Sequence, residues 1–243
     1  MDDYSPKHVF DFQAVAGVEL TLFGLFFMLA SHRHLKILQH AVIFVFWHSV
    51  VLLLCHKIRP TDPTETAKRP MLYLVISQLT GAVLSIGTNK SLVGYSWMAG
   101  ETAWTTAGNA VMGCLSGLAV GVYVLASSNT GMFSSVVARA LVVLLTTAFC
   151  CSLMVRDPRH MRNACSAIVG AYVFVLGVDC FAQAGYFNHL IVFVGVNGRA
   201  AYAAGDGAMV LHAMTPVFSL IAGLWQAYDG RGVLQSRAWT WPI

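Results

Sequence analysis

The chain has 243 residues, of which 57% are hydrophobic and only 11% are charged, and its mean hydropathy is +0.65. Soluble domains carry about 25% charged residues, so this composition excludes an ordinary water-soluble protein and indicates a surface that faces lipid. The formal net charge of +4 comes from scattered Lys and Arg without a contiguous basic stripe, and we therefore expect no nucleic-acid partner.

Seven apolar segments approach the roughly 20 residues that a helix needs to cross a hydrocarbon core of about 30 Å. The sequence therefore predicts an all-α fold, a polytopic membrane helix bundle with about seven transmembrane helices, forming a single domain over 1–243. The predicted helices cover 12–30, 35–56, 70–87, 104–127, 131–155, 161–185 and 207–227.

Three stretches outside these helices have distinct characters. Residues 57–69 are predicted to form a hydrophilic loop. Residues 186–206 are apolar but broken by glycines, and we interpret them as an interfacial or re-entrant segment. Residues 228–243 are expected to be a short C-terminal tail.

The two membrane faces differ in basic residues. The turns 31–36, 88–91 and 156–162, together with the C-terminus, hold more Lys and Arg than the opposite face. Because cytoplasmic loops carry the excess, we expect the N-terminus to be outside or lumenal and the C-terminus cytoplasmic, in the plasma membrane or an endomembrane.

A stripe of glycines marks the fourth predicted helix. Gly113, Gly117 and Gly121 are four residues apart, so they lie on one helix face and let another backbone approach closely. This spacing predicts tight helix packing. The partner helix is expected in the same chain, with a second copy of the chain as the alternative.

Ionisable residues inside membrane segments are costly and are therefore functional candidates. Glu19, Arg139 and Asp179 share a predicted depth of roughly 10 Å from the face that has the N-terminus. Other polar residues expected at about this level are His48, Gln78 and His212.

This intramembrane polar layer has two interpretations. If the side chains point inward, they form a chamber in which Arg139 pairs with Asp179 or Glu19, and the remaining carboxylate binds a cation or relays a proton. Alternatively, an ion pair and hydrogen bonds hold the helices together, or Glu19 and Arg139 reach the interface.

Enzyme signatures are missing from the sequence. It has no HExxH, Walker or GxSxG motif, and no His pair with metal-ligand spacing, so we expect no catalysis, metal or cofactor. Segment 207–227 has no lysine for a retinal Schiff base. DRY and NPxxY motifs of rhodopsin-family receptors are also lacking.

Four stretches carry a family resemblance. They are GLFFMLASHRHLKILQHAVIFVFW, LLLCHKIRPTD, NAVMGCLSGLAVGVYVLA and GAYVFVLGVDCFAQAGYFNHL. The last of these holds Asp179 together with Gly170 and Gly177, which we expect to be further helix-packing positions. Together they resemble the transmembrane protein 198-like family, whose domain is also found in seven-transmembrane superfamily member 3. One departure is Trp47-His48, where the family has small residues.

The resemblance implies a multi-pass membrane protein without established catalysis, and some relatives are linked to receptor signalling as scaffolds. We expect a non-enzymatic scaffold or subunit of a membrane complex, whose partners are the lipid bilayer and other membrane proteins or a second copy. The alternative is a transporter or channel for a cation or proton that uses the polar layer. An accessory subunit of a proton-pumping assembly is a third hypothesis.

Overall fold

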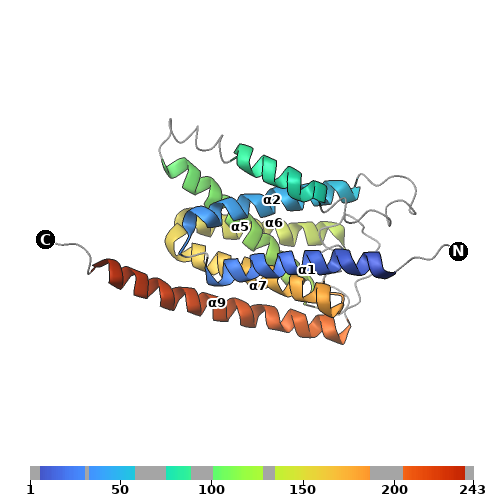
Figure 1. The fold of residues 1–243 in the computed structure, drawn as a ribbon. Helices are drawn as coiled ribbons and strands as arrows, with labels where there is room; N and C mark the ends of the chain where they lie inside the picture. The colour runs from blue at the N-terminus through green and yellow to red at the C-terminus, as the bar shows by residue number, and fades with distance from the viewer. Residues whose placement is uncertain are drawn as a thin grey trace.

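The fold is an all-helical bundle. The structure, a computed structural model, describes residues 6–30, 33–57, 75–88, 101–127, 135–186 and 205–238. Its helices are α1 (Pro6–Leu29), α2 (Leu35–Lys57), the helix Val75–Thr88, α5 (Glu101–Leu125), α6 (Val136–Arg156), α7 (Pro158–Ala182) and α9 (Asp206–Ala238). Figure 1 shows these helices side by side, with α1 beginning and α9 ending at opposite ends of the bundle.

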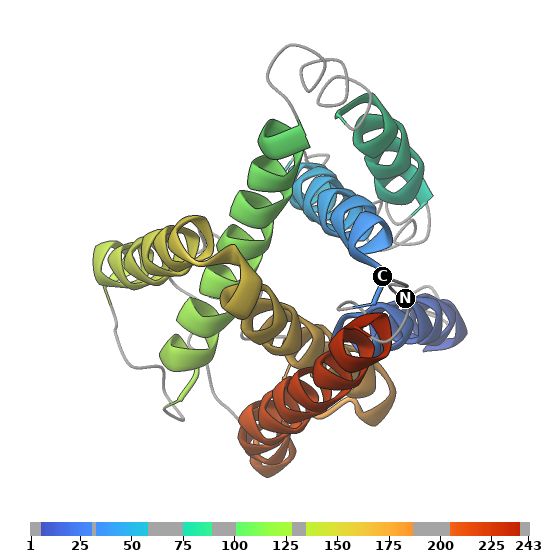
Figure 2. The same cartoon turned by 90° about the vertical axis from the view of Figure 1, so that its left-hand side faces the viewer.

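Helix α7 lies at the centre of the bundle. It contacts α1, α5, α6 and α9, and 61% of its apolar segment is buried within the protein. In α6, which has the highest mean hydropathy, 2.1, the buried residues are only Arg139, Cys150 and Met154. Figure 2 shows α6 at the outside, against α5. The apolar surface of α6 is therefore suited to face lipid.

Within the described part of the chain, four helices are long and apolar enough to cross a membrane. They are α6 and the segments Thr106–Leu125, His160–Ala182 and Asp206–Asp229. The described apolar parts of the first three helices are shorter: Ala14–Leu29, Ile37–His48 and Val75–Thr88. The all-α bundle is confirmed, while seven crossings stay a prediction.

The bounds of several helices differ from the prediction, and α1, for example, begins at Pro6 instead of residue 12. Helix α9 continues to Ala238, so the first part of the expected tail 228–243 is helical. A helix can continue beyond its membrane-spanning part, because water or polar groups can surround the turns that are no longer apolar. Helix α7 ends at Ala182 because Gln183, with φ 51°, adopts the left-handed conformation that closes a helix.

The predicted loop and re-entrant segment lie almost wholly outside the described residues, which exclude 58–74 and 187–204. The turn between α6 and α7 is described. Asp157 caps α7 by accepting a hydrogen bond from the backbone N–H of His160, and Pro158 occupies the first helical position. Cap and proline together make this turn a single residue long.

Candidate functional site

Glycines bring α1 and α7 into close antiparallel contact. A Cβ on Gly24 would lie 2.5 Å from the backbone N of Phe174, and one on Gly177 would lie 2.6 Å from the backbone N of Thr21. Gly170 and Gly17 make similar approaches, to Met28 and to Cys180. No side chain fits between these backbones, so the α1–α7 seam depends on glycine at these positions.

The predicted glycine stripe forms a second seam, between α5 and α6. A Cβ on Gly113 would lie 2.9 Å from the Cα of Cys151, and one on Gly117 would overlap the Cα of Thr147. Gly121 faces the side chain of Thr146. The partner of this stripe is therefore in the same chain.

A buried glutamine forms hydrogen bonds that connect three helices at the end of the bundle where α1 ends. Gln226 of α9 is fully buried, and its amide nitrogen donates to the carbonyls of Phe27 and Met28 at 2.9 and 2.8 Å. Its amide oxygen accepts from the hydroxyl of Ser166 in α7 at 3.0 Å. Because the last turn of a helix lacks intrahelical donors, Gln226 serves as a C-cap of α1 supplied by another helix.

Beside this C-cap, an exposed ion pair joins the α1–α2 turn to α9. The Nε of Arg33 donates to a carboxylate oxygen of Asp229 at 2.6 Å, and a second guanidinium nitrogen donates to the other oxygen. The hydrogen bond and the charge of Asp229 raise the pKa of Arg33, so the guanidinium remains charged. The pair fixes the turn against α9.

Two members of the predicted polar layer meet directly. The amide of Gln78 donates a hydrogen bond to the carboxylate of Glu19, which joins the helix Val75–Thr88 to α1. His48 of α2 lies against the same helix, where a Cβ on Gly81 would be 3.0 Å from its backbone N. These three residues hold the outer helix in place.

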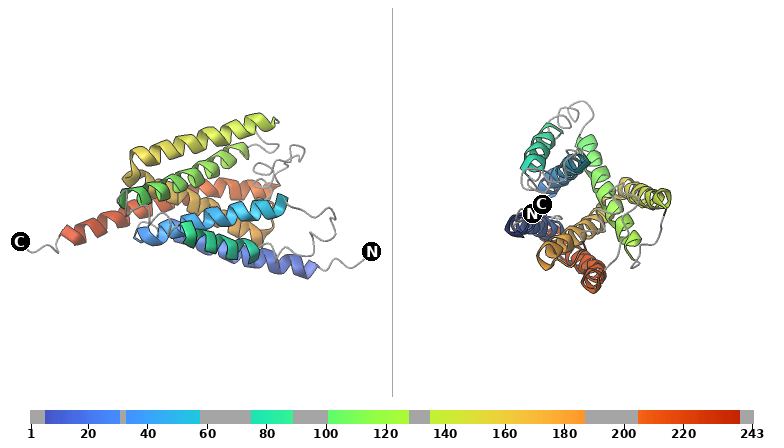
Figure 3. Two further views of the ribbon diagram at one scale, coloured as in Figure 1. Left: turned by 90° about the horizontal axis from the view of Figure 1, so that it is seen from above. Right: turned by 90° about the vertical axis from the view of Figure 1, so that its right-hand side faces the viewer.

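The other members of the layer lie on different helices. Arg139 of α6 and Asp179 of α7 are buried, with exposed fractions of 9% and 3%. His212 of α9 is also buried. Helix α9 lies on the far side of α7 from the helix Val75–Thr88, which carries Gln78 (Figure 2, Figure 3). The six residues are thus spread around the bundle.

His212 belongs to a polar cluster near the beginning of α9, which we call the His212 cluster. Its ring stacks on Tyr123 of α5 with centroids 4.0 Å apart, and its Nε2 lies 3.3 Å from the hydroxyl of Ser127. The hydroxyls of Tyr186 and Thr215 are 3.1 Å apart in the same region. The cluster connects α5, the residues after α7, and α9.

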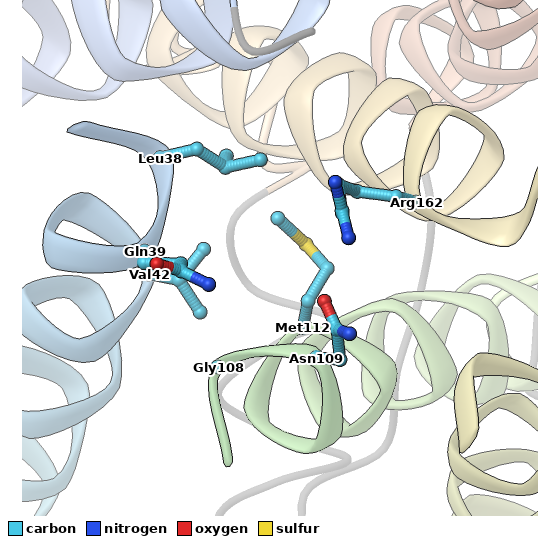
Figure 4. A pocket seen from close by; sticks show the side chains of 7 residues that line it. All are labelled: Leu38, Gln39, Val42, Gly108, Asn109, Met112 and Arg162. Atoms are coloured by element: carbon cyan, nitrogen blue, oxygen red, sulfur yellow. The ribbon is translucent and has the colours of Figure 1, made fainter. Parts of the chain in front are cut away.

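A small cavity lies between α2, α5 and α7 and contains about 10 Å³ of free space, enough for one water. Figure 4 shows Gln39, Asn109 and Arg162 directed into it from the three helices. Val42 and Met112 supply part of its apolar wall.

Sequence reasoning missed Gln226, Gly17, Gly24 and Arg162. Gly17 and Gly24 are seven residues apart, as are Gly170 and Gly177, and this matched spacing was the available signal for the first seam. Gln226 carries no local signal, because the carbonyls of Phe27 and Met28 are almost two hundred residues away in the chain and Ser166 is 60 residues away.

Comparison with known proteins gives one match. The family model described as TM7S3/TM198-like domain matches residues 17–227 of the chain. Neither a curated protein nor a solved structure matches it.

Proposed function

We propose that this chain, which belongs to the TM7S3/TM198-like domain family, acts as a non-enzymatic scaffold or as a subunit of a membrane complex. Its multi-pass membrane character follows from the family and from the apolar helices. The observation that carries the functional proposal is that polar side chains inside the bundle form hydrogen bonds between helices.

These side chains bond to one another across helices. Gln78 donates to Glu19, and Ser166 donates to Gln226, each pair joining two helices. In a membrane, such hydrogen bonds and close glycine contacts supply the attraction that water supplies in a soluble protein. The polar groups in these pairs therefore fix helix positions, as a rigid platform for partner proteins requires.

The cavity between α2, α5 and α7 bears on the alternative hypothesis, transport of a cation. A cavity of about 10 Å³ accommodates one water, whereas passage of a hydrated cation needs several connected waters. This cavity is lined by Arg162 and lies at the opposite end of α7 from Asp179. It therefore adds no support for a cation route along the predicted polar layer.

Extraction from native membranes in polymer nanodiscs tests the proposal without stripping weakly held partners. We expect the tagged chain to occur in particles that hold a second protein, or a second copy, at a constant molar ratio through two independent purification steps. Quantitative mass spectrometry and single-particle mass measurement provide that ratio. Particles holding one copy of this 26.3 kDa chain and no stoichiometric partner would contradict it.

Transport is the second candidate, favoured by the burial of Asp179 and Arg139, since ionisable groups within membrane helices commonly serve ion pathways. We expect wild-type proteoliposomes to pass protons and monovalent cations no faster than protein-free vesicles. Asp179→Asn should then change only stability in detergent. A flux that Asp179→Asn abolishes, and that the exposed control Asp206→Asn retains, would establish transport and overturn the scaffold proposal.

A further inference from the structure

The side chain of Arg162 lines the cavity between α2, α5 and α7 and has no counter-ion among the residues that the structure describes. Arg162 is half-buried, its Nε is shielded from solvent, and it forms no hydrogen bond or ion pair with any residue that the structure describes. A guanidinium has five N–H donors and no acceptor, and leaving such a group buried and unpaired is costly. The buried Nε of Arg162 therefore lacks an acceptor among the residues that the structure describes.

The nearby acidic side chains are already engaged. Asp157 contacts the ring of His160, with an oxygen to Nδ1 distance of 2.9 Å, and Asp229 pairs with Arg33. Among the described side chains at this end of the bundle, the carboxylates are those of Asp157 and Asp229, and neither is paired with Arg162. An anion in the cavity would supply the missing counter-charge.

The other polar groups of the cavity suit an anion. Gln39 and Asn109 are buried, with exposed fractions of 4% and 9%, and their amides point toward the same space as Arg162 (Figure 4). Each amide offers two N–H donors, and the neighbouring Gly108 leaves room for the Gln39 side chain, which a Cβ would approach to 3.1 Å. Three helices thus direct donors to one point.

We propose that this cavity binds an oxygen of a phosphate group from an anionic lipid headgroup, with Arg162 as the charged ligand. Arg162 lies about 6 Å along α7 from Pro158, near the boundary of the apolar segment that begins at His160, which is the depth of lipid phosphates. Space for one water-sized group admits a single phosphate oxygen, with the rest of the headgroup outside the cavity. The proposal is independent of the scaffold role.

The test uses the purified full chain and native mass spectrometry. Phosphatidic acid, phosphatidylglycerol and the zwitterionic phosphatidylcholine are offered in turn. We expect the two anionic lipids to be retained and Arg162→Gln to weaken their retention about tenfold or more, because a charge-assisted hydrogen bond is lost. The control Arg156→Gln, at an exposed arginine of the same end, should retain wild-type binding.

A second arm distinguishes the source of the phosphate. Inorganic phosphate is added to the chain in phosphatidylcholine nanodiscs, and thermal unfolding is followed. If inorganic phosphate stabilises the wild-type chain but not Arg162→Gln, the site binds a soluble phosphate, and the lipid source is overturned. Equal lipid retention by wild type and Arg162→Gln would overturn the site itself. If Arg162→Gln does not fold, Asn109→Leu, which keeps the charge, should still weaken anionic lipid retention, and unchanged retention would overturn the site.

Discussion

Replacing Gly24 with alanine should separate α1 from α7 and lower the free energy of unfolding by about 3 kcal/mol or more. The new Cβ would lie 2.5 Å from the backbone N of Phe174 and 2.6 Å from its Cα. Overpacking against side chains costs about 1–3 kcal/mol, and a backbone can yield less than a side chain. For a chain of this size the loss corresponds to a drop in Tm of about 10 °C, measurable by thermal unfolding in detergent.

A glycine without close neighbours provides the control. Gly87 is the penultimate residue of the helix Val75–Thr88 and has open space where a Cβ would be added. Gly87→Ala should leave the Tm unchanged or raise it slightly, because alanine is the better helix former. Equal Tm values for Gly24→Ala and Gly87→Ala would show that α1 and α7 are not in backbone contact.

Gln226→Leu should also destabilise the bundle, by about 3 kcal/mol. Leucine keeps most of the volume but removes the donor to the carbonyls of Phe27 and Met28 and the acceptor for Ser166. Each buried polar group left without its partner costs about 1–3 kcal/mol. Unfolding in a graded series of detergent mixtures would measure the loss.

Two further variants test whether the loss of stability comes from the capping hydrogen bonds or from any substitution in α9. Ser166→Ala removes one of the three hydrogen bonds and should cost about 1 kcal/mol. Tyr228→Leu changes a side chain of the same helix that is 78% exposed, and should have little effect. A loss in Gln226→Leu no larger than in Tyr228→Leu would contradict the capping role.

Helix existence and the α5–α6 seam were accessible from the sequence because both depend on local spacing. Apolar runs predict helices, and Gly113, Gly117 and Gly121 share one face of a single helix. The α1–α7 seam depends instead on two helices about 150 residues apart. Sequence spacing within α1 shows that Gly17 and Gly24 share a face, but it does not show which helix that face meets.

For the polar layer, the sequence predicts how deep each residue lies in the membrane but not which residues meet. Counting residues along each helix predicts depth, since each residue advances the helix by a fixed rise. It does not predict the rotation of a helix about its axis or its place in the bundle. Glu19 and Gln78 therefore meet, whereas His212 stacks on Tyr123 on the other side of α7.

Arg162 illustrates why a residue type alone misleads. In the sequence it belongs to a basic turn, and such residues are commonly solvated at a membrane face. Cap formation by Asp157 begins α7 at Pro158, so that Arg162 lies one turn inside the helix and against α2 and α5. That single-residue turn is what distinguishes it from the exposed Arg156.

The seam between α1 and α7 has a consequence for biogenesis. Helix α1 is synthesised first, yet the backbone that fills its glycine face emerges about 150 residues later, after on the order of 10 s of translation. During that interval α1 must stay in the bilayer beside lipid, the insertion machinery or a chaperone. Its face of small residues is then open to other newly made helices, so the ribosome-bound stage is when this chain is most vulnerable to mispairing.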